Sequence, residues 1–368
     1  MSNHQSLRVA LVAPPYFSVP PAAYGGVEAV VADLADALVE RGHRVTLIGA
    51  GQCHTRARYL PVWEKTIPEG LGHPLPEVLH AAASLRAVQQ LACADGLDVV
   101  HDHTLAGPLN APAYGALRLP TVVTMHGPVD PARQRLFALL GRDVHLVAIS
   151  DRQRHLAPGL NWVGTVHNAL RVQTWPFRAS KEDYALFLGR FDPDKGPHLA
   201  LDAAHEAGLP LVLAGKCAEP RERAYFEREI RPRLGARDTY VGEADAVAKR
   251  ELLAGARCLL FPVQWEEPFG MVMIEAMACG TPVVALRAGS VPEVVVDGVT
   301  GFVLDDPSEL VPALQRVGEI NPHACRWHVV ENFSAEQLAV GYEAAYGTAM
   351  SFAGRHRLTE HEYVLARF

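Results

Sequence analysis

Short runs of strand character alternate along the chain with longer segments of helical periodicity. From Val27 to Leu38 apolar residues recur with the spacing of one helix face, and the pattern stops at Gly42. A second segment of this kind covers 78–91. The runs that predict strands are 7–12, 45–48, 98–101, 121–125, 145–149, 163–167, 184–188, 211–214, 239–241, 258–261, 283–286 and 301–303. This alternation predicts an α/β protein whose parallel sheets are covered by helices on both faces.

The length of the chain indicates more than one domain. At 368 residues it is too long for one ordinary core and suits two domains of about 150 to 180 residues each. The segment between the two series of strands is polar and lacks clear periodicity. We therefore expect a first domain at 1–170, a linker at 171–183 and a second domain at 184–333. A last helix should begin after Ser334 and reach about Tyr346, because a capping box precedes it.

Composition and charge narrow the classes of function. The chain is 49% hydrophobic and 20% charged with a net charge of −7, which gives no electrostatic case for binding nucleic acid or acidic lipid. Its 6 cysteines are scattered without a Cys-x-x-Cys pair, so we expect free thiols in a reducing compartment. The polar start lacks the apolar core of a signal peptide, and no run approaches the ~18 apolar residues of a membrane span. We expect a cytoplasmic protein, and the sequence leaves its oligomeric state open.

The segment with the clearest candidate binding residues is 265–282, with the sequence WEEPFGMVMIEAMACGTP. From Gly270 to Cys279 the residues are apolar except for Glu275, and a helix that is apolar all round is buried. A carboxylate inside such a helix needs a polar ligand or a charged partner. Glu267 and a Pro-Phe-Gly turn precede the helix, whose first amides suit anionic oxygens. These groups together fit a nucleotide sugar, whereas the alternative is an ordinary buried helix that tolerates one glutamate.

The same stretch resembles a known family. Seven residues separate Glu267 from Glu275 within EPFGMVMIE, which is followed by AMACGTPVVA, and this pattern resembles the signature of retaining glycosyltransferase family 4. That family has the GT-B fold, in which two doubly wound Rossmann-like domains face a central cleft. The resemblance implies this architecture here, with 334–368 forming a helix that crosses back to the first domain and a tail of undefined order. It covers most of the chain and is strongest in 184–304.

By this resemblance the second domain binds a nucleotide-sugar donor. Glu275 corresponds to the second glutamate of the family signature and is expected to hold the ribose hydroxyls. Glu267 and the backbone amides of Phe269, Gly270 and Met271 are expected to lie against the donor hexose.

Two cations follow the first strand of the second domain, in GRFDPDKG. Arg190 and Lys195 suit a pyrophosphate, although a solvated charged turn explains these residues at least as well when they are considered alone. The resemblance favours the pyrophosphate, because Gly-Arg followed by Lys-Gly at this spacing is the family's diphosphate-binding pair. Asp192 and Asp194 imitate an Asp-x-Asp metal motif, but with two cations beside them charge balance is the better interpretation. We expect no metal site.

The first domain gives weaker signals. Gly25 and Gly26 open its first crossover helix, where turn geometry is a sufficient explanation, whereas the resemblance places a glycine-rich loop beside the donor phosphate and the acceptor. His126 follows a strand in TMHGP, and the family often has a histidine there that touches the donor sugar. The His-Asp-His triplet at 101–103 is unsuited to one metal, since neighbouring side chains of an extended chain point to opposite faces. We interpret it as polar loop groups at a strand end.

These observations predict a retaining glycosyltransferase that moves a hexosyl group from a UDP- or GDP-linked sugar to a small-molecule or carbohydrate acceptor. The candidate catalytic residues are His126, Arg190, Lys195 and Glu267. The nucleotide sugar is a substrate, so no cofactor is expected. The alternatives are a sugar-nucleotide epimerase or phosphorylase of the same architecture, or a protein that binds nucleotide sugars without transfer. An NAD dehydrogenase is disfavoured, because the first crossover lacks Gly-x-Gly-x-x-Gly.

Overall fold

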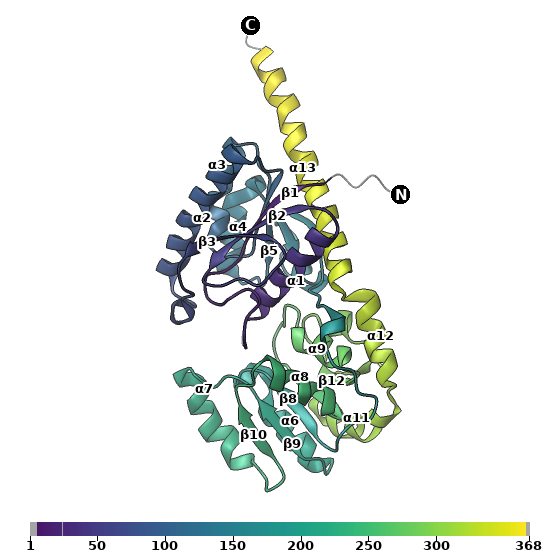
Figure 1. Cartoon of the computed structure of the whole chain (residues 1–368). Helices are drawn as coiled ribbons and strands as arrows, with labels where there is room; N and C mark the ends of the chain where they lie inside the picture. Colours follow the sequence, from purple (N-terminus) through teal and green to yellow (C-terminus); the bar gives the residue numbers. More distant parts are fainter. Residues whose placement is uncertain (1–5, 24, 366–368) are drawn as a thin grey trace. The chain divides into compact units, whose positions relative to one another are not determined.

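The computed structural model describes residues 6–23 and 25–365, with side chains described up to residue 352. Within it the chain forms two compact units (Figure 1). The first unit contains Gly25–His167 and the chain from Ala335 onward, together with the first strand, and the second contains Asn168–Ser334. The residues 171–183, predicted as a linker, belong to the second unit.

The first unit is built on a seven-stranded parallel sheet in the order β3-β2-β1-β4-β5-β6-β7. Its strands are β1 Arg8–Val12, β2 Arg44–Ala50, β3 Arg58–Trp63, β4 Val99–Asp102, β5 Thr121–Met125, β6 Val144–Ala148 and β7 Trp162–Thr165. Its α-helices are α1 Gly26–Glu40, α2 Pro74–Ala94, α3 Ala111–Ala116, α4 Pro131–Leu140, α5 Asp151–His155 and α13 Ala335–Leu365.

Alternate residues of the strands in this sheet face different helices. Val100 of β4 lies in a buried cluster with Val88 of α2, whereas its neighbour His101 contacts Tyr346 of α13. This follows from the period of two in a strand, which sends successive side chains to opposite faces. The sheet is therefore covered on both faces, as the continuous apolar runs predicted.

Strand β3 was not predicted from the sequence. It lies at the edge of the first sheet and pairs only with β2 among the described strands. Its side chains are half-buried or exposed, and it contains Pro61, which cannot donate to a ladder and is therefore tolerated at an edge. A strand that buries so little apolar surface lacks the continuous run by which the other strands were recognised.

Helix α13 is longer than predicted. It begins directly after Ser334, as expected, but continues to Leu365 instead of ending near Tyr346, so the tail expected from residue 350 is helical as far as it is described. Residues 366–368 lie outside the described residues. The helix packs along α1 (Figure 1), and the guanidinium of Arg41 at the end of α1 contacts the carboxylate of Glu343 at 2.6 Å.

The second unit is built on a six-stranded parallel sheet in the order β10-β9-β8-β11-β12-β13. Its strands are β8 Ala185–Leu188, β9 Leu211–Ala214, β10 Thr239–Gly242, β11 Cys258–Phe261, β12 Val283–Leu286 and β13 Gly301–Leu304. Its α-helices are α6 Pro197–Glu206, α7 Pro220–Tyr225, α8 Ala246–Gly255, α9 Met271–Ala278, α10 Val291–Val294, α11 Leu310–Arg316 and α12 Pro322–Asn332.

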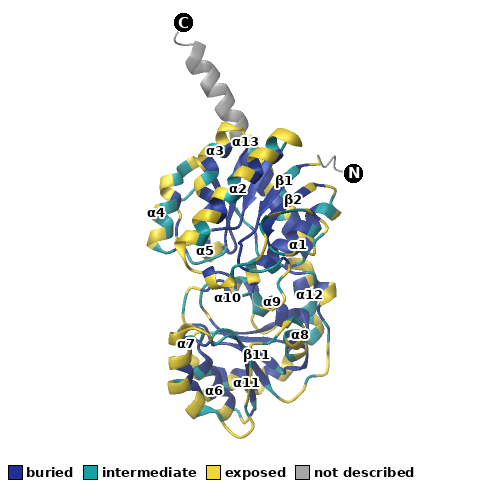
Figure 2. Cartoon of the chain, turned by 60° about the vertical axis from the view of Figure 1, so that its left-hand side comes forward, coloured by how far each residue is buried: buried dark blue, intermediate teal, exposed yellow. Residues whose placement is uncertain are grey.

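In both units the central strands are buried, and many of the exposed residues lie on the surrounding helices and loops (Figure 2). The two parallel sheets confirm the predicted α/β class with two doubly wound sheets. Among the described residues, no helix combines the length and the apolar character that crossing a lipid bilayer would require.

Candidate functional site

Helix α9 is the buried helix that the sequence predicted. Its N-cap, Gly270, has a φ of 77°, a left-handed conformation that favours glycine because it lacks a Cβ. From Met273 to Ala278 every residue is buried, including Glu275. The turn and the helix therefore place one carboxylate within otherwise apolar packing.

The charged partner of Glu275 is Lys249, which sequence reasoning missed. Lys249 lies on α8, and its ammonium donates to Glu275 Oε1 at 2.7 Å. The same ammonium lies 5.2 Å from the centroid of the Trp175 ring. Because a carboxylate buried without a partner is costly, this ion pair explains how α9 can contain Glu275 at 8% exposure. No local pattern signals the pair, since the two residues come from different helices.

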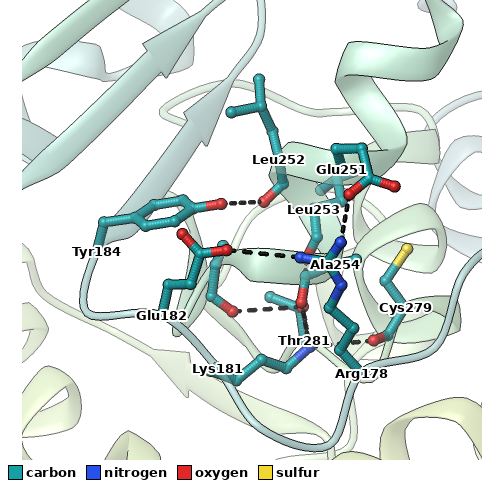
Figure 3. Close-up of polar contacts among 11 residues, drawn as sticks. Arg178, Lys181, Glu182, Tyr184, Glu251, Leu252, Leu253, Ala254, Cys279 and Thr281 are labelled. Atoms are coloured by element: carbon teal, nitrogen blue, oxygen red, sulfur yellow. Dashed lines mark hydrogen bonds and ion pairs between the residues drawn. The ribbon is translucent and has the colours of Figure 1, made fainter.

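Helices α8 and α9 are joined at their C-terminal ends by Lys181 (Figure 3). Its ammonium donates to the carbonyl of Ala254 at 2.9 Å, to that of Cys279 at 3.0 Å and to the hydroxyl of Thr281 at 2.8 Å. Cations are favourable at helix C-termini, where carbonyls lack partners within the helix. Burial nevertheless lowers the pKa of Lys181 to about 8. This contact fixes the helix that carries Lys249 against the one that carries Glu275.

Glu267 forms a second ion pair on the other side of the Pro-Phe-Gly turn. Its Oε2 contacts the ammonium of Lys195 and also accepts from the indole N–H of Trp265 at 2.9 Å. The Lys195 ammonium lies 4.8 Å from the centroid of the Trp265 ring. The structure thus brings together Lys195, which was predicted to bind the diphosphate, and Glu267, which was predicted to bind the hexose. The two residues are distant in the sequence.

The loop before α10 supports this turn. The backbone N–H of Ser290 donates to the carbonyl of Glu267 at 3.0 Å, and its hydroxyl donates to the carbonyl of Phe269 at 2.7 Å. Gly289 has a φ of 54°, and a Cβ there would lie 2.2 Å from the carbonyl oxygen of Glu267. Only glycine allows this approach, so the position of Glu267 depends on two segments that are distant in sequence.

Arg190 lies in the same loop as Lys195 but has a different environment. Its side chain is 40% exposed, and its Nη1 lies 3.8 Å from Oε1 of Glu222. Glu222 is buried, and its Oε2 accepts from the N–H groups of Ala218 and Glu219 at 2.9 and 3.0 Å. The guanidinium therefore keeps donors available for an anionic ligand while a buried carboxylate compensates part of its charge.

The two aspartates of this loop have structural contacts. Asp192 caps the short 3-10 turn Pro193–Lys195 by accepting from the N–H of Asp194 at 3.1 Å, and it lies 3.7 Å from the guanidinium of Arg221. Across the described residues, His, Cys, Asp and Glu side chains form no group of three arranged to hold a metal ion.

In the first unit the glycine pair begins α1. Gly25 is the N-cap, with a φ of 141°, and Gly26 is the first helical residue. The first turn of α1 contains Glu28, which sequence reasoning missed, at 3% exposure. Burial raises the pKa of Glu28 to about 7, while hydrogen bonds from the backbone of Glu28 and Phe17 oppose the rise. A buried carboxyl group with a raised pKa thus lies beside the predicted glycine loop.

His126 lies directly after β5 and contacts a second histidine. Its Nε2 is 2.8 Å from Nδ1 of His103, and burial lowers its pKa to about 4. His101 is bonded through its two ring nitrogens to the hydroxyls of Tyr346 at 2.8 Å and Thr124 at 2.7 Å. These three histidines therefore form one cluster in the first unit, in which His101 and His103 are buried and His126 is partly exposed.

The interpretation of 101–103 as polar loop groups was wrong. His101 and Asp102 belong to β4, and all three side chains are buried. Asp102 Oδ1 accepts from the N–H and the hydroxyl of Thr104, and burial raises the pKa of Asp102 to about 7. The sequence pattern could not reveal this, because polar residues at a strand end are more often exposed than buried.

Comparisons with known proteins agree with this arrangement. A family model described as Glycosyltransferase Family 4 matches residues 24–191, and one described as Glycosyl transferases group 1 matches 175–328. A phosphatidyl-myo-inositol mannosyltransferase of Mycobacterium tuberculosis is 28% identical over 335 residues, which cover 83% of this chain and 85% of the relative. An alpha-maltose-1-phosphate synthase of the same species is 30% identical over 305 residues, which cover 67% of this chain and 78% of the relative.

The fold is also found among solved structures. The crystal structure of a glycosyltransferase involved in avilamycin A biosynthesis aligns with a TM-score of 0.71 and 28% identity, and the alignment covers 94% of this chain and 98% of that one. Such a match over nearly the whole of both chains shows that the two proteins share the GT-B fold.

Proposed function

Because this chain belongs to glycosyltransferase family 4 and has the GT-B fold, we propose that it transfers a hexosyl group from a UDP- or GDP-linked sugar with retention of configuration. The acceptor is a small molecule or a carbohydrate. That the chain is a glycosyltransferase follows from the family, whereas the donor, the acceptor and the stereochemistry are parts of the proposal.

The observation that carries the proposal is the pair of ion pairs around the Pro-Phe-Gly turn. Lys195 contacts Glu267 before the turn, and Lys249 contacts Glu275 within the helix after it. Each carboxylate can accept from sugar hydroxyls, and each ammonium can donate to hydroxyl or phosphate oxygens. A ligand with a hydroxyl-bearing ribose, a diphosphate and a hexose has complementary groups for all four side chains.

The proposed roles divide along the donor. Glu275 accepts from the ribose hydroxyls, Arg190 and Lys195 bind the diphosphate, and Glu267 orients the hexose. The backbone amides of Phe269, Gly270 and Met271 at the start of α9 also lie against the hexose. In the first unit, the loop at Gly25 and Gly26 lies near phosphate and acceptor, and His126 acts on the transferred sugar.

In the proposed reaction the acceptor hydroxyl attacks the anomeric carbon on the face from which the diphosphate departs. The bond from the anomeric carbon to the diphosphate oxygen breaks, the bond to the acceptor oxygen forms, and a diphosphate oxygen takes the acceptor's proton. No enzymic nucleophile is required, so the protein contributes by orienting the two substrates and stabilising the negative charge that develops on the leaving group.

Ligand-induced thermal shifts test the nucleotide part of this proposal. Purified protein is melted with UDP, GDP, ADP and dTDP, because a ligand at about 100 times its dissociation constant stabilises the folded state by about 2.7 kcal/mol. We expect UDP or GDP to stand out. A shift confined to ADP or dTDP would contradict the donor class, and no shift with any of the four would contradict nucleotide binding at this site.

Product analysis tests transfer and stereochemistry. The sugar nucleotide that matches the stabilising base is incubated with the protein, and the anomeric configuration of the released or transferred hexose is followed by proton NMR as it forms. Retention supports the proposal, inversion contradicts the retaining mechanism, and a bound but unconsumed donor favours a non-catalytic binding protein. Conversion of the donor to an epimer would instead favour an epimerase of the same fold.

A further inference from the structure

The histidine cluster of the first unit encloses His103 between two other imidazole rings. Nδ1 of His103 is 2.8 Å from Nε2 of His126, and the centroids of these two stacked rings are 5.1 Å apart. The ring of His101 lies 4.0 Å from that of His103. His103 itself is 4% exposed. It therefore meets His126 through one nitrogen and is otherwise surrounded by protein.

Both partners in the His103–His126 contact are neutral near pH 7. Burial lowers the pKa of His126 to about 4 and holds that of His103 well below its ordinary range. A neutral imidazole has one N–H and one bare nitrogen, so only one of the two facing nitrogens carries the proton of the hydrogen bond. Either His103 donates to His126, or His126 donates to His103.

The second nitrogen of His103 decides between these arrangements. Within the described part of the chain, Nε2 of His103 is buried without a hydrogen-bond partner. If His103 accepted from His126, its own proton would lie on this nitrogen and form a buried N–H with no acceptor. If His103 instead donates through Nδ1, its Nε2 carries no proton and has only an unused lone pair. Buried N–H groups without partners are the rarer and more costly defect.

We infer that His103 is a positioning residue that donates its Nδ1–H to Nε2 of His126 and so fixes the proton of His126 on Nδ1. His126 then presents a neutral N–H donor to a ligand, and cannot accept a proton through Nε2 while the contact persists. That the ligand atom is an oxygen of the transferred sugar rests on the proposed function. His101 supports the arrangement, because hydroxyl groups occupy both of its ring nitrogens and hold its ring against His103.

Two substitutions at one position separate hydrogen bonding from packing. His103→Asn retains an N–H donor on the atom bonded to Cγ, where Nδ1 lies in histidine, whereas His103→Leu fills similar space without a donor. Long-range nitrogen–proton NMR correlations report which ring nitrogen carries the proton. The His126 signals are identified as those that vanish in His126→Ala.

In the wild-type protein and in His103→Asn we expect His126 to have its proton on Nδ1, and in His103→Leu we expect it on Nε2 or on both nitrogens in exchange. Turnover should fall about tenfold or more in His103→Leu and about threefold or less in His103→Asn. Affinity for the free nucleoside diphosphate, measured by calorimetry, should stay unchanged in both, because the side chains proposed to bind it, Glu275, Arg190 and Lys195, belong to the second unit.

Three results would overturn the inference. A wild-type spectrum with the proton of His126 on Nε2 refutes it directly, even if neither variant folds. An unchanged tautomer in a folded His103→Leu protein refutes the role of His103, and equal losses of turnover in the Asn and Leu variants show that only packing matters. Failure of the proposed function is distinct, because the wild-type protein would then show no transfer, whereas its spectrum would still report the tautomer of His126.

Discussion

At the scale of single residues, Glu275 offers the sharpest test of nucleotide binding. Glu275→Gln keeps the shape of the side chain but removes the charge that accepts from hydroxyl groups and pairs with Lys249 at 2.7 Å. We expect the affinity for the preferred nucleoside diphosphate to fall about tenfold or more, because one charge-assisted hydrogen bond contributes about 1.5–3 kcal/mol. Calorimetry measures this directly. The matched control is Glu251→Gln, which changes a half-exposed glutamate of α8 that pairs with Arg178 and should leave the affinity unaltered.

The cations of the GRFDPDKG loop give a second prediction at this scale. If Arg190 and Lys195 stabilise the departing diphosphate, activity should survive excess EDTA, and each single substitution by alanine should reduce turnover by about 10²-fold or more. Arg221→Ala provides the control, since this side chain is 72% exposed and lies 3.7 Å from Asp192 in the same region. Loss of activity in EDTA, its return with manganese and an equal defect in Asp194→Ala would instead identify a metal site.

At the scale of the elements, apolar patterns determined what could be predicted. Strand β11 was expected at 258–261 and is found at Cys258–Phe261, because a buried parallel strand is a continuous apolar run. Helix α9 and the turn before it were recognised for the same reason. Strand β3 was missed because an edge strand buries too little to leave such a run. Lys249 was missed, and His103 was wrongly interpreted as a polar loop group, because their partners come from other elements and only tertiary packing brings them together.

The hydrogen bonds by which Lys181 connects α8 and α9 give a prediction at this scale. Lys181→Met removes a donor from two C-terminal carbonyls and from Thr281, which belong to buried residues and are drawn in Figure 3. Leaving these groups without their donor should lower the free energy of unfolding by about 3 kcal/mol. It should also weaken nucleotide binding, because Lys249 and Glu275 are carried by the two helices.

Urea denaturation and calorimetry measure the two effects of Lys181→Met. Arg178→Met is the matched control, because Arg178 lies in the same segment but pairs with Glu182 and Glu251 at the surface. Its effect should stay below about 1 kcal/mol. A Lys181→Met protein that is destabilised yet binds nucleotide with unchanged affinity would show that the Lys181 contacts do not orient the ion pair of Lys249 and Glu275.

At the scale of the whole molecule, the chain leaves the first unit at His167 and returns to it at Ala335. The returning helix contributes to the interior of that unit, since Tyr342 and Tyr346 are fully buried and the hydroxyl of Tyr342 meets that of Thr124 at 2.7 Å. The first unit therefore cannot complete its core until the second has been synthesised. A pattern of apolar residues predicted that such a helix exists but not that it extends to Leu365.

The ion pair that attaches this helix gives a pH-dependent prediction. Arg41 and His43 donate to the carboxylate of Glu343 at 2.6 and 2.8 Å, and chiefly the contact with Arg41 lowers the pKa of Glu343 to about 2. Because this pKa is depressed in the folded state, the stabilisation is complete above the ordinary value of 4.5 and is lost as the pH falls toward 2. Glu343→Gln should therefore lower the free energy of unfolding by about 1–2 kcal/mol at neutral pH, and the difference from wild type should shrink below about pH 4.

Urea titrations between about pH 7 and pH 3 measure this difference, with Glu336→Gln as the control because Glu336 is 79% exposed and lies 3.8 Å from Arg41. A difference that stays constant over this range would mean that packing of the side chain, and not its charge, attaches α13 to α1.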